Sequence, residues 1–266
     1  MANPAPRSQN DPTPGDSYVQ SFARGLEVIR SFSAQAPQQT LSEVAGRSGL
    51  TRAGARRILL TLQALGYVQT DGKLYRLTPR ILDLGFAYLS SMPIWDLAEP
   101  VMEALVAQVK ESCSAAMLDG SDIVYVLRVP THKIMRIALG VGSRLPAFCT
   151  SMGRVLLADL PEDEMLARLR ASDLQARTRH TITDIDTLCA RIAQARRQGW
   201  CLVNQELEEG LISLAAPITN RAGRAVAALN ISGQANRTNA KAAQEQLLPP
   251  LLDSARTISR LLAQQA

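Results

Sequence analysis

The sequence predicts an α+β protein built from an N-terminal winged helix-turn-helix and a larger C-terminal domain in which helices flank an antiparallel sheet. Two observations predict this class. Three helical patterns and a basic hairpin follow one another in residues 18–78, and strand-rich runs are mixed with helical patterns in residues 95–266. The 266 residues are 46% hydrophobic, which suits one or two globular domains and excludes a wholly disordered chain.

Composition excludes several classes of protein. Residues 1–17 are polar and rich in proline, so we expect a disordered lead-in rather than a signal peptide. No run approaches the roughly 20 apolar residues of a membrane span, and we expect a cytoplasmic protein with no membrane partner. The sequence has no C-x-x-C pair and only two histidines, so we expect no metal, no cofactor and no disulfide framework. The four cysteines are Cys113, Cys149, Cys189 and Cys201, and the two histidines are His132 and His180.

The first two helices are predicted from apolar spacing and from capping residues. Residues 21–33 place apolar side chains at helical spacing, namely Phe22, Leu26, Ile29 and Phe32. Residues 41–48 form a short second helix. Thr40 precedes it as an N-cap, and Glu43 three residues later completes a capping box. Gly49 ends this helix.

A third helix and a hairpin complete the winged helix-turn-helix. The helix begins at Thr51, runs to about Ala64, and repeats its apolar residues at helical spacing: Ala55, Ile58, Leu59, Leu62 and Leu65. Two short strands follow, joined by the turn at Asp71–Gly72, which is a hairpin signal. In this motif the third helix enters the major groove of DNA.

Positive charge is concentrated in the same region. Between Arg47 and Arg80 the chain carries seven basic residues and one acid, Asp71. This density indicates a polyanion as partner, although a solvated charged face is the alternative. Arginines at the helix start can pair with guanine or with phosphate, and a lysine at the hairpin tip can reach the backbone. The candidate DNA-binding residues are Thr51, Arg52, Ala53, Arg56, Arg57 and Lys73.

Residues 79–94 predict a linker helix that is unusually apolar for a spacer. Its apolar residues include Ile81, Leu82, Leu84, Leu89 and Met92. Apolar surface outside a core usually marks an interface. Packing against its own domain and dimerisation are both open at this point.

The remaining residues, 95–266, predict an α+β domain for effector binding and oligomerisation. A helix over 95–111 precedes three strand runs, at 112–118, 123–129 and 133–141. Helices follow at about 151–159, 161–171 and 184–198, then strands at 210–218 and 225–233, and a last helix over 239–264. Consecutive strand runs with short turns favour an antiparallel sheet.

The order of elements and several long motifs resemble the IclR family of bacterial transcriptional regulators. The motifs are LSEVAGRSGLTRAGARRILLTLQALGYV and YRLTPRILDLG in the first half, and VGSRLPAFCTSMGRVLLA, GWCLVNQELEEGLISLAAPI and AALNISG in the second. The wording GSRLPAFCTSMGRVLLA most resembles the branch that controls aromatic-acid breakdown through protocatechuate and β-ketoadipate. The resemblance implies a GAF-like or profilin-like C-terminal domain, a homodimer or a dimer of dimers, double-stranded operator DNA, and a small effector.

The resemblance also implies where the effector binds. The matching positions are Phe148, Cys149, Thr150, Ser151, Met152, Val203, Asn204, Ser213, Ala215, Asn230 and Ser232. Alternate strand positions can turn these hydroxyls and the amide to one face, and the helix start at Thr150–Ser151 can hold a carboxylate. We expect Arg136 and Arg144, on or after the approaching strand, to form a carboxylate clamp.

The predicted function is a transcriptional regulator that responds to a small aromatic or dicarboxylic acid of the protocatechuate, 4-hydroxybenzoate or β-ketoadipate class, with RNA polymerase as a partner if it activates. Enzyme motifs such as G-x-S-x-G and the P-loop are absent from the sequence, and both histidines are expected at the surface. The acids Glu206, Glu208 and Glu209 are expected in a solvated loop. An alternative is a redox switch in which the helix start lowers the pKa of Cys149.

Overall fold

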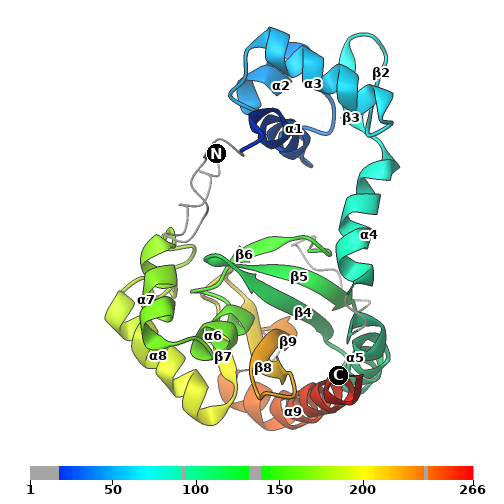
Figure 1. Ribbon diagram of the computed structural model, residues 1–266. Coiled ribbons are helices and arrows are strands. Elements are labelled where there is room, and N and C mark those ends of the chain that lie inside the picture. Colours follow the sequence, from blue (N-terminus) through cyan, green and yellow to red (C-terminus); the bar gives the residue numbers. More distant parts are fainter. Residues whose placement is uncertain (1–17, 92–93, 132–138, 237–238, 266) are drawn as a thin grey trace. The chain divides into compact units, whose positions relative to one another are not determined.

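The structure is a computed structural model that describes residues 18–91, 94–131, 139–236 and 239–265 (Figure 1). It divides into two compact units between Met92 and Pro93. The expected lead-in 1–17 lies outside the described residues. None of the described helices is long and apolar enough to cross a membrane.

The first unit has the three helices and the hairpin that the sequence predicts, and one short additional strand, β1 (Gln39–Thr40). Its helices are α1 (Gln20–Arg30), α2 (Leu41–Arg47) and α3 (Arg52–Ala64), and its other strands are β2 (Val68–Thr70) and β3 (Leu74–Leu77). The strands form one sheet in the order β1-β3-β2, with Thr40 opposite Leu74. A small core holds the three helices and the hairpin together: Val28, Val44, Ala45, Ala55, Leu59, Leu62 and Val68.

Side-chain caps begin α2 and α3 as predicted. The Thr40 hydroxyl accepts a hydrogen bond from the Glu43 N–H at 3.4 Å, and the Glu43 carboxylate accepts from the Thr40 N–H at 2.8 Å. At α3 the Thr51 hydroxyl accepts from the Gly54 N–H at 3.1 Å. These bonds satisfy donors that a helix start leaves unpaired.

Several apolar side chains of the first unit are more exposed than predicted. On α1, Phe22 is 68% exposed and Leu26 is 42% exposed, and Leu65 after α3 is 53% exposed. The apolar spacing correctly predicts the helices, but within one chain their outer faces have too little protein to pack against. The α1 helix also ends at Arg30, before the expected residue 33.

The linker is shorter than the predicted helix over residues 79–94. A 3₁₀ turn over Pro79–Ile81 leads into α4 (Leu82–Ser90), and residues 92–93 lie outside the described residues. No α4 residue is buried within the chain. The structure therefore shows no packing of this helix into a core of its own chain.

The second unit is a six-stranded antiparallel sheet between two layers of helices, which confirms the predicted class. The strand order is β6-β5-β4-β9-β8-β7. In chain order the strands are β4 (Ser112–Asp119), β5 (Asp122–Val129), β6 (Arg144–Pro146), β7 (Cys201–Asn204), β8 (Leu211–Thr219) and β9 (Ala225–Gln234).

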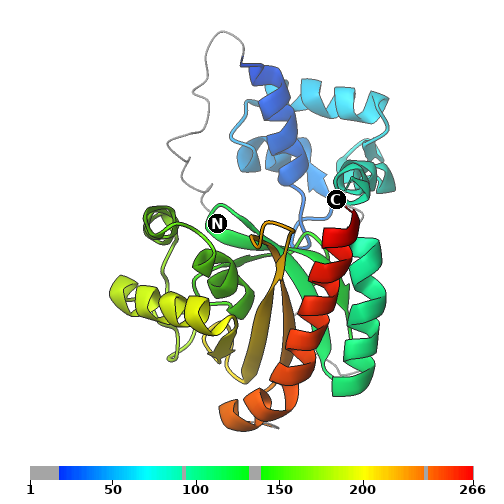
Figure 2. The same cartoon turned by 60° about the horizontal axis from the view of Figure 1, so that its bottom comes forward.

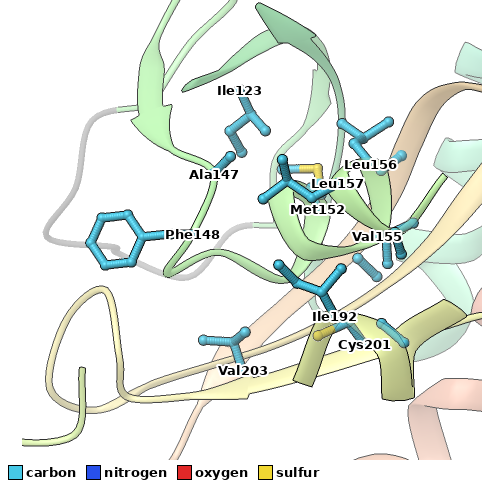
Figure 3. Close-up of a cluster of buried hydrophobic side chains, with 14 of the residues drawn as sticks. Ile123, Ala147, Phe148, Met152, Val155, Leu156, Leu157, Ile192, Cys201 and Val203 are labelled. Carbon is cyan, nitrogen blue, oxygen red and sulfur yellow. The ribbon is translucent and has the colours of Figure 1, made fainter. Parts of the chain in front are cut away.

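The helices of this unit cover the sheet in two groups. Figure 2 shows α5 (Ile94–Val109) and α9 (Ala240–Gln265) side by side along the sheet, and α9 packs mainly on β8. The other group is α6 (Ser151–Ala158), α7 (Glu162–Ala171) and α8 (Ile185–Gln198). Figure 3 shows the core of that group, where Met152 and Leu157 of α6 lie near Ile192 of α8 and Cys201 of β7.

The predicted strand over residues 133–141 lies mostly outside the described residues, which omit 132–138. Its last part, residues 139–141, is not in a strand. The strand that pairs with β5 is β6, where Arg144 lies opposite Val124.

Candidate functional site

A cavity in the second unit lies between the sheet and the start of α6. It encloses about 490 Å³ of space not filled by protein atoms, a volume that includes open solvent at its mouth. It is lined by Tyr125, Arg128, Leu139, Cys149, Thr150, Ser151, Met152, Val203, Leu207, Leu211, Ser213, Asn230 and Ser232.

Hydroxyl and amide groups from three elements meet at Ser213 on β8. Its Oγ lies 2.8 Å from Ser151 Oγ at the start of α6. It accepts hydrogen bonds from Asn230 Nδ2 at 3.1 Å and from Ser232 Oγ at 3.2 Å, both on β9. The sheet register explains this convergence, because Ser213 lies opposite Ser232 and Ala215 lies opposite Asn230.

More donors lie around Ser213 Oγ than its two lone pairs can accept. A hydroxyl oxygen has one proton and two lone pairs, yet three groups can donate to Ser213 Oγ. Ser213 itself can donate to the Ile231 carbonyl at 3.3 Å or to Ser151. In either case one donor, from Ser151, Ser232 or Asn230, has no acceptor inside the cluster. The cluster therefore offers a hydrogen-bond donor to an acceptor in the cavity.

The start of α6 is held tightly against the turn before it. The Thr150 hydroxyl accepts from the Gly153 N–H at 3.1 Å and donates to the Pro146 carbonyl at 3.1 Å. A Cβ at Gly153 would lie 2.2 Å from the Ala147 carbonyl oxygen, so only glycine fits at this contact. The Thr150 side chain is thus committed to capping and is not a free donor for a ligand, in contrast to the sequence-based expectation.

A buried ion pair supports the same region. Arg154 of α6 and Glu206 after β7 are bidentate partners, at 2.7 Å for Nη1–Oε1 and 2.5 Å for Nη2–Oε2. Arg154 also donates to the Phe148 carbonyl at 2.8 Å, and the Ile182 N–H donates to Glu206 at 3.2 Å. The expectation that Glu206 lies in a solvated loop is wrong, because its side chain is only 9% exposed.

Cys149 does not have the environment of a reactive thiol. Burial raises its pKa to about 11, although the positive charges of Arg177 and Arg154 act in the opposite direction. The sequence-based expectation of a lowered pKa is wrong, since desolvation disfavours the thiolate more than nearby charges favour it. The redox alternative therefore loses the observation on which it depended.

The structure brings together most of the predicted pocket residues, but not all. Phe148 (Figure 3) and Ala215 are fully buried in the core, and Asn204 is exposed on β7. Arg144 is not a cavity residue, because its guanidinium pairs with Asp119 and Asp122. Arg136 and His132 lie outside the described residues, and His180 is exposed. The others line the cavity: Cys149, Thr150, Ser151, Met152, Val203, Ser213, Asn230 and Ser232.

Five lining residues were missed by the sequence analysis. Leu207 and Leu211 lie in or next to the motif segment QELEEG, so the resemblance held a signal for them. Tyr125 and Arg128 had none, because they are three apart on β5 and strict alternation would turn them to opposite faces. Leu139 lies next to residues that the structure does not describe.

A second candidate surface lies on the first unit. Thr51, Arg52, Ala53, Arg56 and Arg57 are exposed at the start of α3, whose opposite side packs into the core. Lys73 is exposed at the hairpin tip, where the Asp71 carboxylate accepts hydrogen bonds from the Lys73 and Leu74 N–H groups at 2.9 and 2.8 Å. Within the described part of the chain these basic side chains form no ion pairs.

Both units match one family. The description "IclR helix-turn-helix domain" matches residues 21–72, and "Bacterial transcriptional regulator IclR C-terminal" matches residues 86–260. The chain belongs to the IclR family of bacterial transcriptional regulators. This confirms the resemblance found in the sequence motifs, and it assigns the described α3 surface to the helix-turn-helix domain of an IclR regulator.

Individual relatives indicate which members of the IclR family the chain is similar to in sequence and structure. The chain is 41% identical to the Pca regulon regulatory protein of Pseudomonas putida over 98% of its own length and 90% of the relative's. A crystal structure from Rhodococcus sp. RHA1, described as a transcriptional regulator, is 50% identical with a TM-score of 0.84 and covers 94% of this chain and all of that one. A double mutant of the PobR inducer-binding domain from Acinetobacter, in complex with 3-hydroxybenzoic acid, is 32% identical with a TM-score of 0.59 and covers 63% and 98%.

Proposed function

We propose that this IclR regulator binds a small aromatic or dicarboxylic acid in the cavity of its second unit, and that the acid changes how the first unit binds operator DNA. The observation that carries the proposal is the surplus of hydrogen-bond donors around Ser213. An unpaired carboxylate costs several kcal/mol to bury in a largely apolar cavity. An unused donor in the cavity wall can hydrogen-bond an oxygen of the acid and so offset part of that cost.

The lining also suits a flat ring. Met152 of α6, Val203 of β7 and Leu207 in the loop after β7 supply apolar surface. Ser151, Ser213 and Ser232 supply polar groups. The named relatives support the same chemical class, since one regulates the Pca regulon and another binds 3-hydroxybenzoic acid. Protocatechuate, 4-hydroxybenzoate and β-ketoadipate are the ligands to test. We assign no catalytic step to the chain.

For DNA, we propose that α3 reads the major groove with the exposed arginines Arg52 and Arg56, and that Lys73 contacts the backbone. Arginine can bond guanine O6 and N7 with two N–H groups. Lysine is a point charge that suits phosphate without regard to sequence. Thr51 both caps α3 and stands exposed, so it can contact a phosphate at the helix start.

We further propose that the chain works as a homodimer or a dimer of dimers. The α1 and α4 helices leave large apolar side chains exposed, among them Phe22 at 68%, Leu82 at 70% and Phe86 at 70%. A second copy would cover these faces and present two α3 helices to half-sites about 10 bp apart or a multiple of that. RNA polymerase is a further partner if the regulator activates its genes.

Isothermal titration of the full chain tests the cavity. Ser151→Ala and Ser232→Ala should each weaken acid binding by about 0.5–1.5 kcal/mol, the size of one hydrogen bond to the ligand. Ser172→Ala is the matched control, because Ser172 lies at the end of α7 and donates to the Arg168 carbonyl outside the cavity. Operator affinity without acid should not change in any of the three.

If both cavity variants bind every acid as tightly as the unchanged protein, the effector site lies elsewhere. A folded protein that binds none of the three acids would overturn the proposed function itself.

A further inference from the structure

The geometry of β5 is unusual at the point where it borders the cavity. In its pairing with β4, Tyr125 lies opposite Ala116 and Leu127 lies opposite Ala115, so Val126 has no partner. This is a β-bulge, which inserts one extra residue and changes which side chains share a face. As a result Tyr125 and Arg128, three residues apart, both line the cavity.

Arg128 stands at the end of a polar row that crosses the sheet. Its Nη1 donates to Ser114 Oγ on β4 at 3.1 Å. Ser114 lies opposite Asn230 on β9, and the Ser114 N–H donates to Asn230 Oδ1 at 3.0 Å. Asn230 then donates to Ser213 and Ser232. The row therefore leads from a guanidinium to the cluster that has a donor to spare.

The charge of Arg128 is not balanced within the described residues. No carboxylate there forms an ion pair with Arg128, and none of the cavity-lining residues is acidic. Two other arginines of this unit differ: Arg144 is paired with Asp119 at 2.6 Å and Arg154 with Glu206. A half-buried guanidinium has five N–H donors, and the single bond to Ser114 leaves most of them for a ligand.

We propose that Arg128, turned into the cavity by the bulge at Val126, binds the carboxylate of the effector and sets the preference for acids over neutral analogues. This inference rests on the proposed function, and it places the carboxylate at the β5 side of the cavity rather than at the start of α6. Ser114 fixes the guanidinium, so that the remaining N–H groups point to a planar carboxylate with little loss of side-chain freedom.

The test measures a ratio of affinities. Protocatechuate and its neutral carboxamide, 3,4-dihydroxybenzamide, are titrated into the full-length protein and into Arg128→Met. The change should weaken binding of the acid about 10- to 100-fold, the effect of losing a hydrogen-bonded charge partner. The carboxamide should change less than about 3-fold. Loss of packing alone would weaken both ligands alike, so the ratio separates charge recognition from structure.

Arg144→Met is the matched control. It removes an arginine of the same unit that already has two carboxylate partners outside the cavity, and the acid-to-amide ratio should stay as it is. If Arg128→Met does not fold, the same affinity ratio is measured in Arg128→Lys. It keeps the charge but loses the planar pair of donors, and the ratio should fall several-fold.

Two results overturn the inference. The first is an unchanged ratio in the folded Arg128 variants, whether both ligands bind as before or both lose affinity equally. The second is a ratio that collapses in Ser151→Ala while Arg128→Met leaves it intact, which would place the carboxylate at α6. Each of these leaves the proposed function standing, because the unchanged protein still binds the acid. If the unchanged protein binds none of the three acids, the proposed function and this inference fail together.

Discussion

The two units of the protein use polar and apolar side chains in opposite ways. Among the described residues, every large hydrophobic side chain that stands exposed lies in the first unit, apart from Val141. The second unit instead buries polar groups, including Ser114, Ser151, Arg154 and Asn230. In the first unit arginines are solvated and apolar faces are uncovered, whereas in the second the apolar surface is covered and polar groups face a cavity.

This difference indicates which kind of partner each unit can bind. Exposed basic groups are available to a large polyanion, and exposed apolar faces to another protein surface. Buried polar groups with a donor to spare are available only to something small enough to enter. Under the proposed function, macromolecules would cover the outer surface of the first unit, and a small ligand would fill the cavity of the second. Five changes test that contrast, from the largest expected effect to the smallest.

The largest effect is expected at the buried ion pair. Arg154→Leu should lower the free energy of unfolding by about 3–5 kcal/mol, because Glu206 would be left buried without its partner. The double change Arg154→Met with Glu206→Leu should restore most of that loss. Urea unfolding measures both. In the first unit, Glu27→Gln removes the exposed pair with Arg30 and should cost less than about 1 kcal/mol. If Arg154→Leu and Glu27→Gln lower the free energy of unfolding by similar amounts, the proposed difference between the buried and the exposed ion pair is wrong.

The next effect concerns the apolar face of α4. Phe86→Ser should weaken self-association by about 1.5–3 kcal/mol for each chain, the value of burying one phenylalanine. Sedimentation over a concentration series measures it. Val141→Ser, which changes the 54% exposed valine of the second unit, is the control and should have no effect. A stable dimer that ignores Phe86→Ser would exclude α4 from the interface.

The exposed arginines should affect DNA binding without affecting folding. Arg52→Ala and Arg56→Ala should each weaken operator binding by about 1–3 kcal/mol where the arginine contacts a base. Lys73→Ala should instead weaken all sequences alike and reduce the slope of log affinity against log salt by about one. Fluorescence anisotropy with operator and unrelated DNA distinguishes the two. Normal operator affinity in a folded Arg52→Ala/Arg56→Ala double variant would contradict base reading by α3.

A smaller effect is expected at the helix cap of the first unit. Thr40→Ala should lower the free energy of unfolding by about 1 kcal/mol. The backbone hydrogen bond from Thr40 lowers the pKa of Glu43. A lowered pKa in the folded state means that the cap stabilises at neutral pH and that its contribution is lost as the pH falls through that pKa. Glu43→Gln should therefore flatten the acid side of the stability profile, and an unchanged profile would contradict this linkage.

The smallest effect is expected from oxidation of Cys149. Since burial raises its pKa to about 11, little thiolate exists at neutral pH. Operator affinity should be the same before and after mild peroxide treatment, and the same in Cys149→Ala. Release of the operator on oxidation, absent in Cys149→Ala, would revive the redox alternative.

The same contrast explains how much the sequence could predict. The helices, caps and hairpin of the first unit follow from neighbouring residues, and Thr40, Thr51 and Asp71 behave as predicted. In the second unit the strands are recognisable, but the site depends on their register. Ser213, Asn230 and Ser232 could be placed from the resemblance. Arg128 could not, because one extra residue in β5 reverses the alternation on which sequence reasoning depends.

The errors at Arg144 and Glu206 have a related cause. The sequence shows a charge but not its partner, which lies 25 residues away for Arg144 with Asp119 and 52 residues away for Glu206 with Arg154. An arginine near a motif was therefore assigned to the ligand although it is paired with two surface aspartates. A glutamate in an acidic turn was assigned to solvent although its partner is buried.

Thr40 links two parts of the first unit that are usually considered separately. It is the last residue of β1, where it pairs with Leu74 next to the hairpin tip, and it is also the N-cap of α2. One residue thus connects the sheet of the hairpin directly to the start of α2. We therefore expect the hairpin and α2 to move together as one rigid body. Because α3 is followed directly by β2 of the same hairpin, Lys73 should keep a constant distance from the arginines of α3. The proposed phosphate contact of Lys73 and the proposed base contacts of these arginines should then form and break together.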